Sequence, residues 1–287
     1  MGLRSTGPML AEIGYQSDWA DILSAGFMRS AMIGGVLVAL AAGMLGYFVI
    51  VRQHAFAAHA LAHIGFPGAT GAVLIGVPVT LGLAVFTVGG ALAIGLLGKR
   101  LAEREIATGT ILALATGIGV LFNSMTTKNA GAVTNVLFGN LLAVSNAQLW
   151  TFGLFTIGLA VVLAVVARPL VFASVNPQVA EAKGVPVRLL GVVFMVALAL
   201  VITMAVQVVG TLLLFGLVVT PAAAALAVSA RPAMVAVLST AFGVVCVLVG
   251  LLLSAMFNLP PSFVIVTLSF LIWLGAIVAT RERNPAT

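Results

Sequence analysis

Long apolar runs without a charged residue dominate this chain, and short polar stretches between them hold the charges. A helix needs about 20 apolar residues to cross the hydrocarbon of a bilayer. Nine segments approach that length: 30–51, 56–75, 79–98, 108–126, 149–167, 189–208, 211–229, 233–256 and 262–280. Membrane β-strands would instead alternate over segments of about 10 residues. The pattern predicts an all-α polytopic membrane protein with about nine transmembrane helices, or eight, because no charge marks the divisions at Gly76 and Gly210.

The distribution of basic residues predicts the orientation of these helices. If all nine segments span and the N-terminus lies outside, ten of the 13 Lys and Arg residues fall on the cytoplasmic side. Cytoplasmic loops of membrane proteins carry such an excess. The expected topology is therefore an external N-terminal segment, 1–25, and a cytoplasmic C-terminus. Segment 1–25 contains Glu12, Asp18 and Asp21 and does not resemble a signal peptide.

Composition agrees with a membrane protein and removes several other classes. The chain has 62% hydrophobic and 7% charged residues, against roughly 45–50% and about 25% in soluble domains. The net charge of +6 comes from scattered residues, so topology explains it and no nucleic-acid partner is expected. Cys246 lies in an apolar run and is expected to pack there. No linker divides the chain, which predicts one transmembrane domain over 1–287.

All three histidines fall in "HAFAAHALAH", residues 54–63. His59 and His63 are four apart, so on a helix their Cβ atoms lie about 5–6 Å apart on one face. Two such imidazoles can share a transition metal, because neutral imidazole suits zinc, iron, nickel and copper. The alternative is that the histidines bond to neighbouring backbone, which is the expectation for His54 beside Arg52.

Other polar side chains in or near the segments are expected to hold helices together; they are Asn123, Ser124, Thr203, Gln207, Thr220 and Ser254.

Two loops have structure of their own. In "SVNPQVAEAKGVPVR", 174–188, Asn176 suits an N-cap, Pro177 the first helical position and Gly184 the position after the last turn. This short cytoplasmic helix, which bears Glu181 and Lys183, either meets a partner protein or is a surface turn. The outer loop, 127–148, is expected to form short, partly buried helices.

No nucleotide-hydrolysing or hydrolytic site can be assembled from the sequence. A P-loop needs Gly-x-x-x-x-Gly-Lys-Ser/Thr. Lys99 is the one lysine that follows a glycine, and it lacks the Ser/Thr after it. The nine segments contain no Asp, Glu, Lys or Arg, so an intramembrane metalloenzyme would lack its general base. The chain is expected not to be an enzyme.

Four motifs in order resemble the membrane permease subunit of bacterial ABC importers for zinc, manganese or iron, the ABC-3 type. They are "VRQHAFAAHALAHIGFPGATGA", "VLFGNLLAVS", "NPQVAEAKGVPVR" and "VVGTLLLFGLVVTPAAAALAVS". In the resemblance His63 matches a histidine of the metal path, and His59 stands where the family commonly has aspartate. Exchange of an oxygen ligand for nitrogen favours zinc over manganese. Asn140 and Asn176 likewise replace family aspartates.

The resemblance also implies partners and a location. The helix with Asn176, Pro177, Ala180, Glu181 and Gly184 would be the coupling helix against a separate ATPase subunit, which binds the ATP. A solute-binding protein would deliver metal from outside, and two permease copies would form the pore in the bacterial inner membrane. No permanently bound cofactor is expected. The alternatives are manganese or iron as cargo, a metal chelate of the siderophore or corrinoid type, and a passive channel.

Overall fold

The computed structural model describes residues 19–97, 101–125, 137–211 and 214–283. Within them, eight helices are long and apolar enough to cross a membrane. They are α2 (Gly26–Val51), α3 (Ala55–Ile75), α4 (Val79–Leu97), α5 (Leu101–Met125), α7 (Asn146–Val175), α9 (Val187–Val209), α12 (Pro232–Phe257) and α13 (Pro261–Arg283). The prediction of an all-α polytopic membrane protein is confirmed.

The ninth predicted segment, 211–229, is not a single span. It contains two short helices, α10 (Leu214–Val218) and α11 (Thr220–Val228). At ~1.5 Å per residue the stretch Leu214–Val228 covers about 22 Å, short of the roughly 30 Å of hydrocarbon. Pro221 has no N–H to continue the helical ladder. Thr220 Oγ1 donates to the Phe215 carbonyl at 3.2 Å, and the same carbonyl accepts from the Val219 N–H at 3.0 Å.

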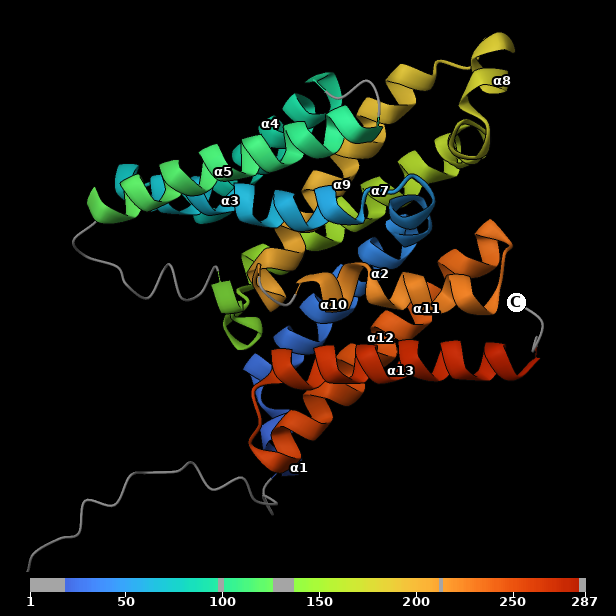
Figure 1. Cartoon of the computed structure of the whole chain (residues 1–287). Helices are drawn as coiled ribbons and strands as arrows, with labels where there is room; N and C mark the ends of the chain where they lie inside the picture. The colour runs from blue at the N-terminus through green and yellow to red at the C-terminus, as the bar shows by residue number, and fades with distance from the viewer. Residues whose placement is uncertain (1–18, 98–100, 126–136, 212–213, 284–287) are drawn as a thin grey trace, which may run out of the picture.

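The lengths therefore support the alternative count of eight spans rather than nine. Together, α10 and α11 still carry the chain from the end of α9 to the start of α12, alongside α13 (Figure 1). A break with this geometry cannot be recognised from hydropathy, because the run stays apolar throughout. The orientation of the two termini remains a prediction.

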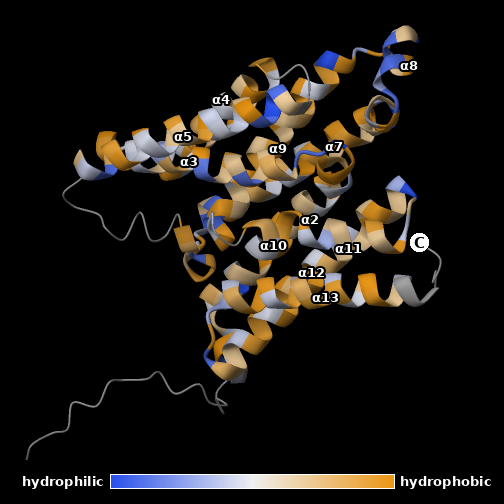
Figure 2. Cartoon of the chain, in the orientation of Figure 1, coloured by the Kyte–Doolittle hydropathy of each residue, from blue (hydrophilic) through white to orange (hydrophobic). Residues whose placement is uncertain are grey.

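The helices form two groups with a shared middle. Figure 1 shows α3, α4 and α5 on one side, α10 to α13 on the other, and α2, α7 and α9 between them. Helices α2, α3 and α9 are mostly buried, whereas less than a quarter of α5, α7 and α13 is buried. Many exposed side chains are large and apolar. Most helical positions are hydrophobic, and hydrophilic residues gather at helix ends and around α8 (Pro177–Ala182) (Figure 2). This distribution suits a protein surrounded by lipid, because apolar side chains remain on its outside.

Backbone contacts at glycines fix one helix crossing and one contact between a loop and a helix end. A Cβ on Gly68 of α3 would collide with the Gly82 carbonyl of α4, so the two helices touch main chain to main chain. Gly139 and Gly210 approach in the same way, and both have positive φ, 74° and 81°. Small residues permit such close approach in membranes. The second contact seats residues of the predicted outer loop on the end of α9.

The predicted loop structures are present where they are described. The 3₁₀ helix η1 (Leu141–Ala143) buries Leu141, and a capping box between Ser145 and Gln148 begins α7. Residues 126–136, which contain most of the rest of that loop, lie outside the described residues. So do residues 1–18 of the predicted N-terminal segment; its later part contains α1 (Trp19–Ser24).

Candidate functional site

The two intramembrane histidines lie together on α3. The ring centroids of His59 and His63 are 4.9 Å apart, and the rings meet edge to face at 72°. Two imidazoles on one tetrahedral zinc, with Zn–N near 2.0–2.1 Å, place their centroids about 5 Å apart. The predicted pair is therefore spaced as two ligands of one ion would be.

The pair is only partly enclosed, and it has an unused ring atom. Both side chains are half-buried, and the Nδ1 atom of His59 is buried without a hydrogen-bond partner. A buried imidazole nitrogen normally has a partner, so a ligand that supplies one suits this position. The ring of Phe215 on α10 lies 6.4 Å from the ring of His59. The start of α10 thus lies beside His59, a contact that no pattern in the sequence predicts.

A proline follows His63 by one helical turn. Pro67 lies inside α3 and has no N–H, so the His63 carbonyl lacks its helical donor. Thr70 Oγ1 lies within hydrogen-bond distance of the Phe66 and Pro67 carbonyls, at 3.1 and 3.2 Å. The histidines therefore lie just before a weakened point of the helix.

Two imidazoles alone do not complete a metal site. Among the described residues, no group of three or more His, Cys, Asp or Glu is placed to hold a metal. Such a two-ligand arrangement binds a passing ion weakly, because structural zinc sites use four protein ligands. It suits transit better than storage.

The third histidine has a different environment. His54 is 4% exposed, and its Nδ1 lies 2.7 Å from the Arg52 carbonyl. A carbonyl can only accept, so Nδ1 carries the hydrogen and donates. Burial, and then the nearby charge of Arg104, lowers the pKa of His54 to about 3. The expectation that His54 bonds to backbone is confirmed.

The predicted short helix is present with its predicted ends. Helix α8 begins at Pro177, the Asn176 side chain accepts from the Val179 N–H at 3.1 Å, and Gly184 has a φ of 80°. Ala180 is buried, while Asn176, Pro177, Glu181 and Gly184 are exposed. Val179 and neighbouring Val175 expose 42% and 68% of their surface, so apolar side chains lie at the edge of this polar helix.

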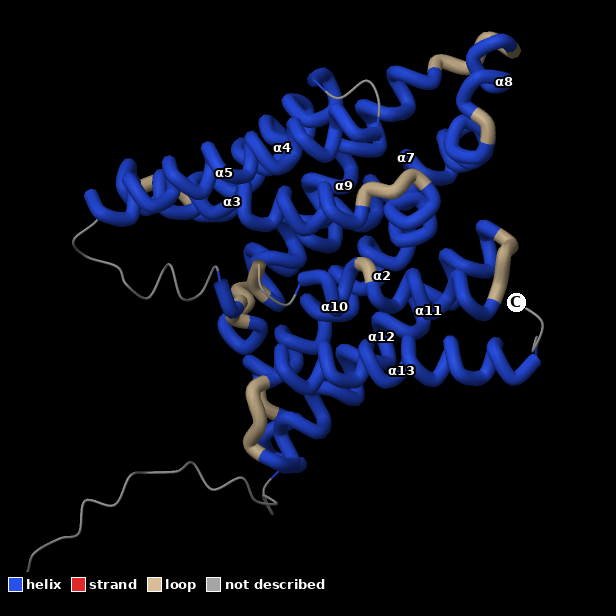
Figure 3. The backbone as a smooth tube through the Cα atoms, in the orientation of Figure 1, coloured by secondary structure: helices blue, strands red, loops and turns tan. Residues whose placement is uncertain are grey.

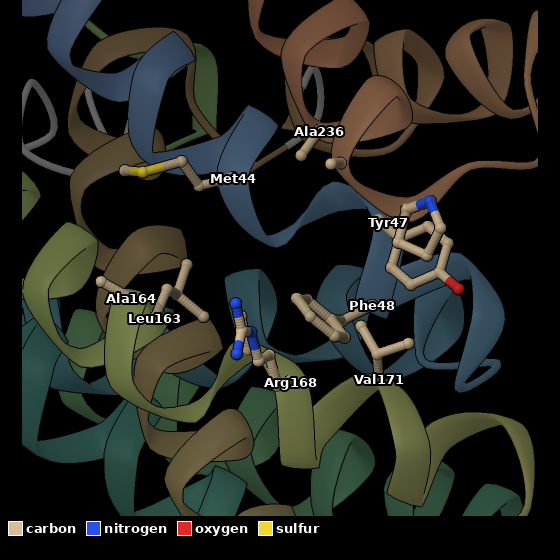
Figure 4. A pocket seen from close by; sticks show the side chains of 11 residues that line it. Met44, Tyr47, Phe48, Leu163, Ala164, Arg168, Val171 and Ala236 are labelled. Atoms are coloured by element: carbon tan, nitrogen blue, oxygen red, sulfur yellow. The ribbon is translucent and has the colours of Figure 1, made fainter.

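A cavity of about 550 Å³ lies elsewhere, between α2, α7 and α12. Its lining is apolar apart from Tyr47 and Arg168, and Figure 4 shows Arg168 between Leu163 and Phe48. It has no imidazole or carboxylate, and a guanidinium repels a cation. The histidine pair, rather than this cavity, is the candidate for metal.

The eight membrane-length helices define a polytopic membrane protein, and the histidine pair within one of them is a candidate ion site. The chain matches the ABC 3 transport family over residues 24–280, and it belongs to that family. It is accordingly a transport subunit and not an enzyme.

Three similar proteins illustrate the family. The manganese transport system membrane protein MntC of Halalkalibacterium halodurans is 31% identical, with 93% of this chain and 92% of the relative covered. MntC of Listeria innocua is 29% identical, with 92% and 94% covered. The solved structure of PsaBC from Streptococcus pneumoniae in complex with Fab is similar with a TM-score of 0.82 at 25% identity, covering 93% of this chain and 99% of that one.

Proposed function

We propose that this chain is the pore-forming permease of an ATP-driven importer of divalent transition metal, and that His59 and His63 bind the metal in transit. The observation that carries the proposal is the 4.9 Å separation of the two rings within a membrane helix. Ionisable side chains inside the membrane are rare and mark ion pathways. Family membership supports the transport class.

Zinc is the proposed cargo, and manganese is the second candidate. Two imidazoles without a carboxylate suit zinc, whereas manganese prefers carboxylate and water oxygens. Manganese is favoured by a different observation, the names of the relatives at 29–31% identity. The ligand type favours zinc and the names of the relatives favour manganese. An uptake experiment in which the two metals compete therefore decides the cargo.

The proposal includes three partners. A separate ATPase docks on α8, where Asn176, Pro177, Ala180, Glu181 and Gly184 define the helix and Val179 exposes apolar surface. An extracytoplasmic metal-binding protein delivers the ion, and a second permease copy completes the pore. The arrangement lies in the bacterial inner membrane, with α8 on the cytoplasmic side as the basic residues predict.

Uptake by the reconstituted transporter tests this function. Proteoliposomes with the ATPase and binding protein receive an equal mixture of zinc, manganese and iron, and ATP-driven accumulation is measured. Zinc uptake is expected in the wild type, its loss in His63→Ala, and a shift toward manganese in His59→Asp. Ile75→Ala, at the exposed end of the same helix, is the control.

Undiminished uptake by His63→Ala would exclude the pair as the transit site. If the wild type takes up manganese in preference to zinc, manganese replaces zinc as the proposed cargo. Failure of all three metals, with uptake of a siderophore or corrinoid complex, would replace the proposal with a chelate importer.

A further inference from the structure

The turn between α2 and α3 joins the histidine helix to three other helices. Arg52 is the C-cap of α2 and His54 is the N-cap of α3, and Figure 3 shows the loop between the two helices in tan. The turn is held by its own backbone: the N–H of His54 donates to Val49 at 2.8 Å, and that of Gln53 to Ile50 at 2.9 Å. Gln53 has a φ of 56°, which non-glycine residues adopt rarely. A strained residue persists only where surrounding contacts hold it.

Arg52 makes contacts with α5, α7 and α9. Its Nη1 donates to Ser174 Oγ near the end of α7 at 3.2 Å, and its guanidinium lies 5.3 Å from the ring centre of Phe194 on α9. Its carbonyl accepts from Arg104 Nη2 of α5 at 3.3 Å, beside the bond from His54. One residue thus connects the start of the histidine helix to three neighbours.

Ser174 stands two residues before Asn176, the N-cap of α8. The hydroxyl that accepts from Arg52 therefore lies in the last turn of α7, next to the proposed ATPase-docking helix. On the other side, His59 lies about one helical turn into α3. Contacts through Ser174, Arg52 and the first turn of α3 therefore connect the start of α8 to the histidines.

The bond between Arg52 and Ser174 is suited to break and re-form. A buried guanidinium is usually held by a carboxylate, often with two parallel bonds. Within the described residues the side-chain acceptor of Arg52 is a hydroxyl, and its buried Nε atom has no hydrogen-bond partner. Burial, and then the charge of Arg104, lowers the pKa of Arg52, which still leaves arginine charged. The cation is thus kept at this position by weak, exchangeable contacts.

We propose that Arg52 is the positioning residue that couples α8 to the metal pair: its bond to Ser174 is made in one state of the transport cycle and released in the other. This rests on the proposed function, because it assumes that an ATPase drives α8. The role is mechanical, and Arg52 does not itself touch metal.

The first test is the number of metal ions carried per ATP hydrolysed. In the reconstituted complex, Arg52→Gln and Ser174→Ala are expected to keep ATP hydrolysis within about twofold of wild type. Metal carried per ATP is expected to fall about fivefold, the factor that corresponds to about 1 kcal/mol at 25 °C. The double variant should fall no further than the single ones, because both remove the same bond.

Thr110→Ala is the matched control. Ser174 Oγ also donates to the Leu170 carbonyl four residues back at 2.6 Å, and Thr110 Oγ1 makes the same kind of bond to Ile106 at 2.9 Å on exposed α5. Loss of that intrahelical bond alone should leave the metal-to-ATP ratio unchanged. An unchanged ratio in both Arg52→Gln and Ser174→Ala would overturn the proposal. If Arg52→Gln fails to assemble, Ser174→Ala decides alone.

A second readout does not depend on metal. Ile75 ends α3 and is 73% exposed, so Ile75→Cys in a Cys246→Ala background reports on α3 through its rate of maleimide labelling in nanodiscs. ATP with vanadate should change that rate in the otherwise native complex and not in Ser174→Ala. If ATP with vanadate leaves the labelling rate unchanged in the complex that retains Ser174, the coupling is overturned. An ATP effect without metal uptake would instead refute the proposed cargo and leave the coupling intact.

Discussion

A chain of amide and hydroxyl groups near the end of α9 should stabilise the bundle through one acceptor atom. Gln207 Oε1 accepts from Thr80 Oγ1 of α4 at 2.8 Å and from Gln148 Nε2 of α7 at 2.9 Å. Its own Nε2 donates to the Thr203 carbonyl at 2.9 Å. Gln207 therefore joins three helices, and Gln207→Leu removes both interhelical bonds while it keeps most of the side-chain volume.

The magnitude follows from the number of bonds lost. Interhelical side-chain bonds in membrane proteins contribute about 0.6 kcal/mol on average and up to about 1.7 kcal/mol. Gln207→Leu should thus lower the free energy of unfolding by about 1–3 kcal/mol. Thr80→Val removes one of the two bonds and should cost about half as much. Each of these two free-energy values includes the cost of leaving hydrogen-bond donors without an acceptor.

Unfolding in mixed micelles titrated with dodecyl sulfate, followed by circular dichroism, measures these differences. Thr151→Val is the control, because Thr151 Oγ1 is exposed and bonds only within α7, to the Ala147 carbonyl at 3.0 Å. Equal stability of Gln207→Leu and Thr151→Val would refute the reasoning. So would a Thr80→Val variant as destabilised as Gln207→Leu, since one bond would then account for the whole effect.

Three further predictions rest on other contacts. Burial, and then the Arg104 charge, depresses the pKa of His54 from 6.5 to about 3, so its stabilisation is complete above pH 6.5 and is lost as the pH falls toward 3. At pH 5 the loss of folding stability is about 2 kcal/mol. A His54→Asn variant should show a correspondingly flatter curve of stability against pH, and both proteins retain His59 and His63. Gly68→Ala should cost about 1–3 kcal/mol by overpacking against Gly82, whereas Gly89→Ala, with open space around it, should be neutral or stabilising in the same dodecyl sulfate titration. Asn176→Ala should speed hydrogen exchange in α8 by the loss of about 1 kcal/mol of capping, while Asn176→Asp, which keeps the acceptor, should not.

Hydropathy located the spans because the cost of a charge in hydrocarbon is large and local. The helices that it missed in part show its limits. Helix α5 begins at Leu101, although Glu103, Arg104 and Glu105 suggested a loop until residue 108. Charged side chains at a membrane edge reach water from within a helix, so charge alone does not end it. Helix α7 likewise continues past Arg168 and Pro169 to Val175.

Some features of the candidate site depend on residues close in the sequence, and others depend on residues far apart in it. The spacing of His59 and His63 and the caps of α8 depend on residues within four positions, and the sequence predicted both. The contacts of Arg52 with Ser174 and of His59 with Phe215 join residues more than 120 positions apart. No periodicity encodes such contacts, because they follow from how the helices cross.

The contact between Gly139 and Gly210 sets an evolutionary constraint of an unusual kind. A side chain on either residue would strike the main chain of the other, not its side chain. A second mutation at the facing position therefore cannot compensate for the first, since both positions already carry the smallest residue. Within the lineage of this protein the two sites should stay fixed independently rather than covary, and methods that infer contacts from paired substitutions will miss one of the tightest contacts in the fold.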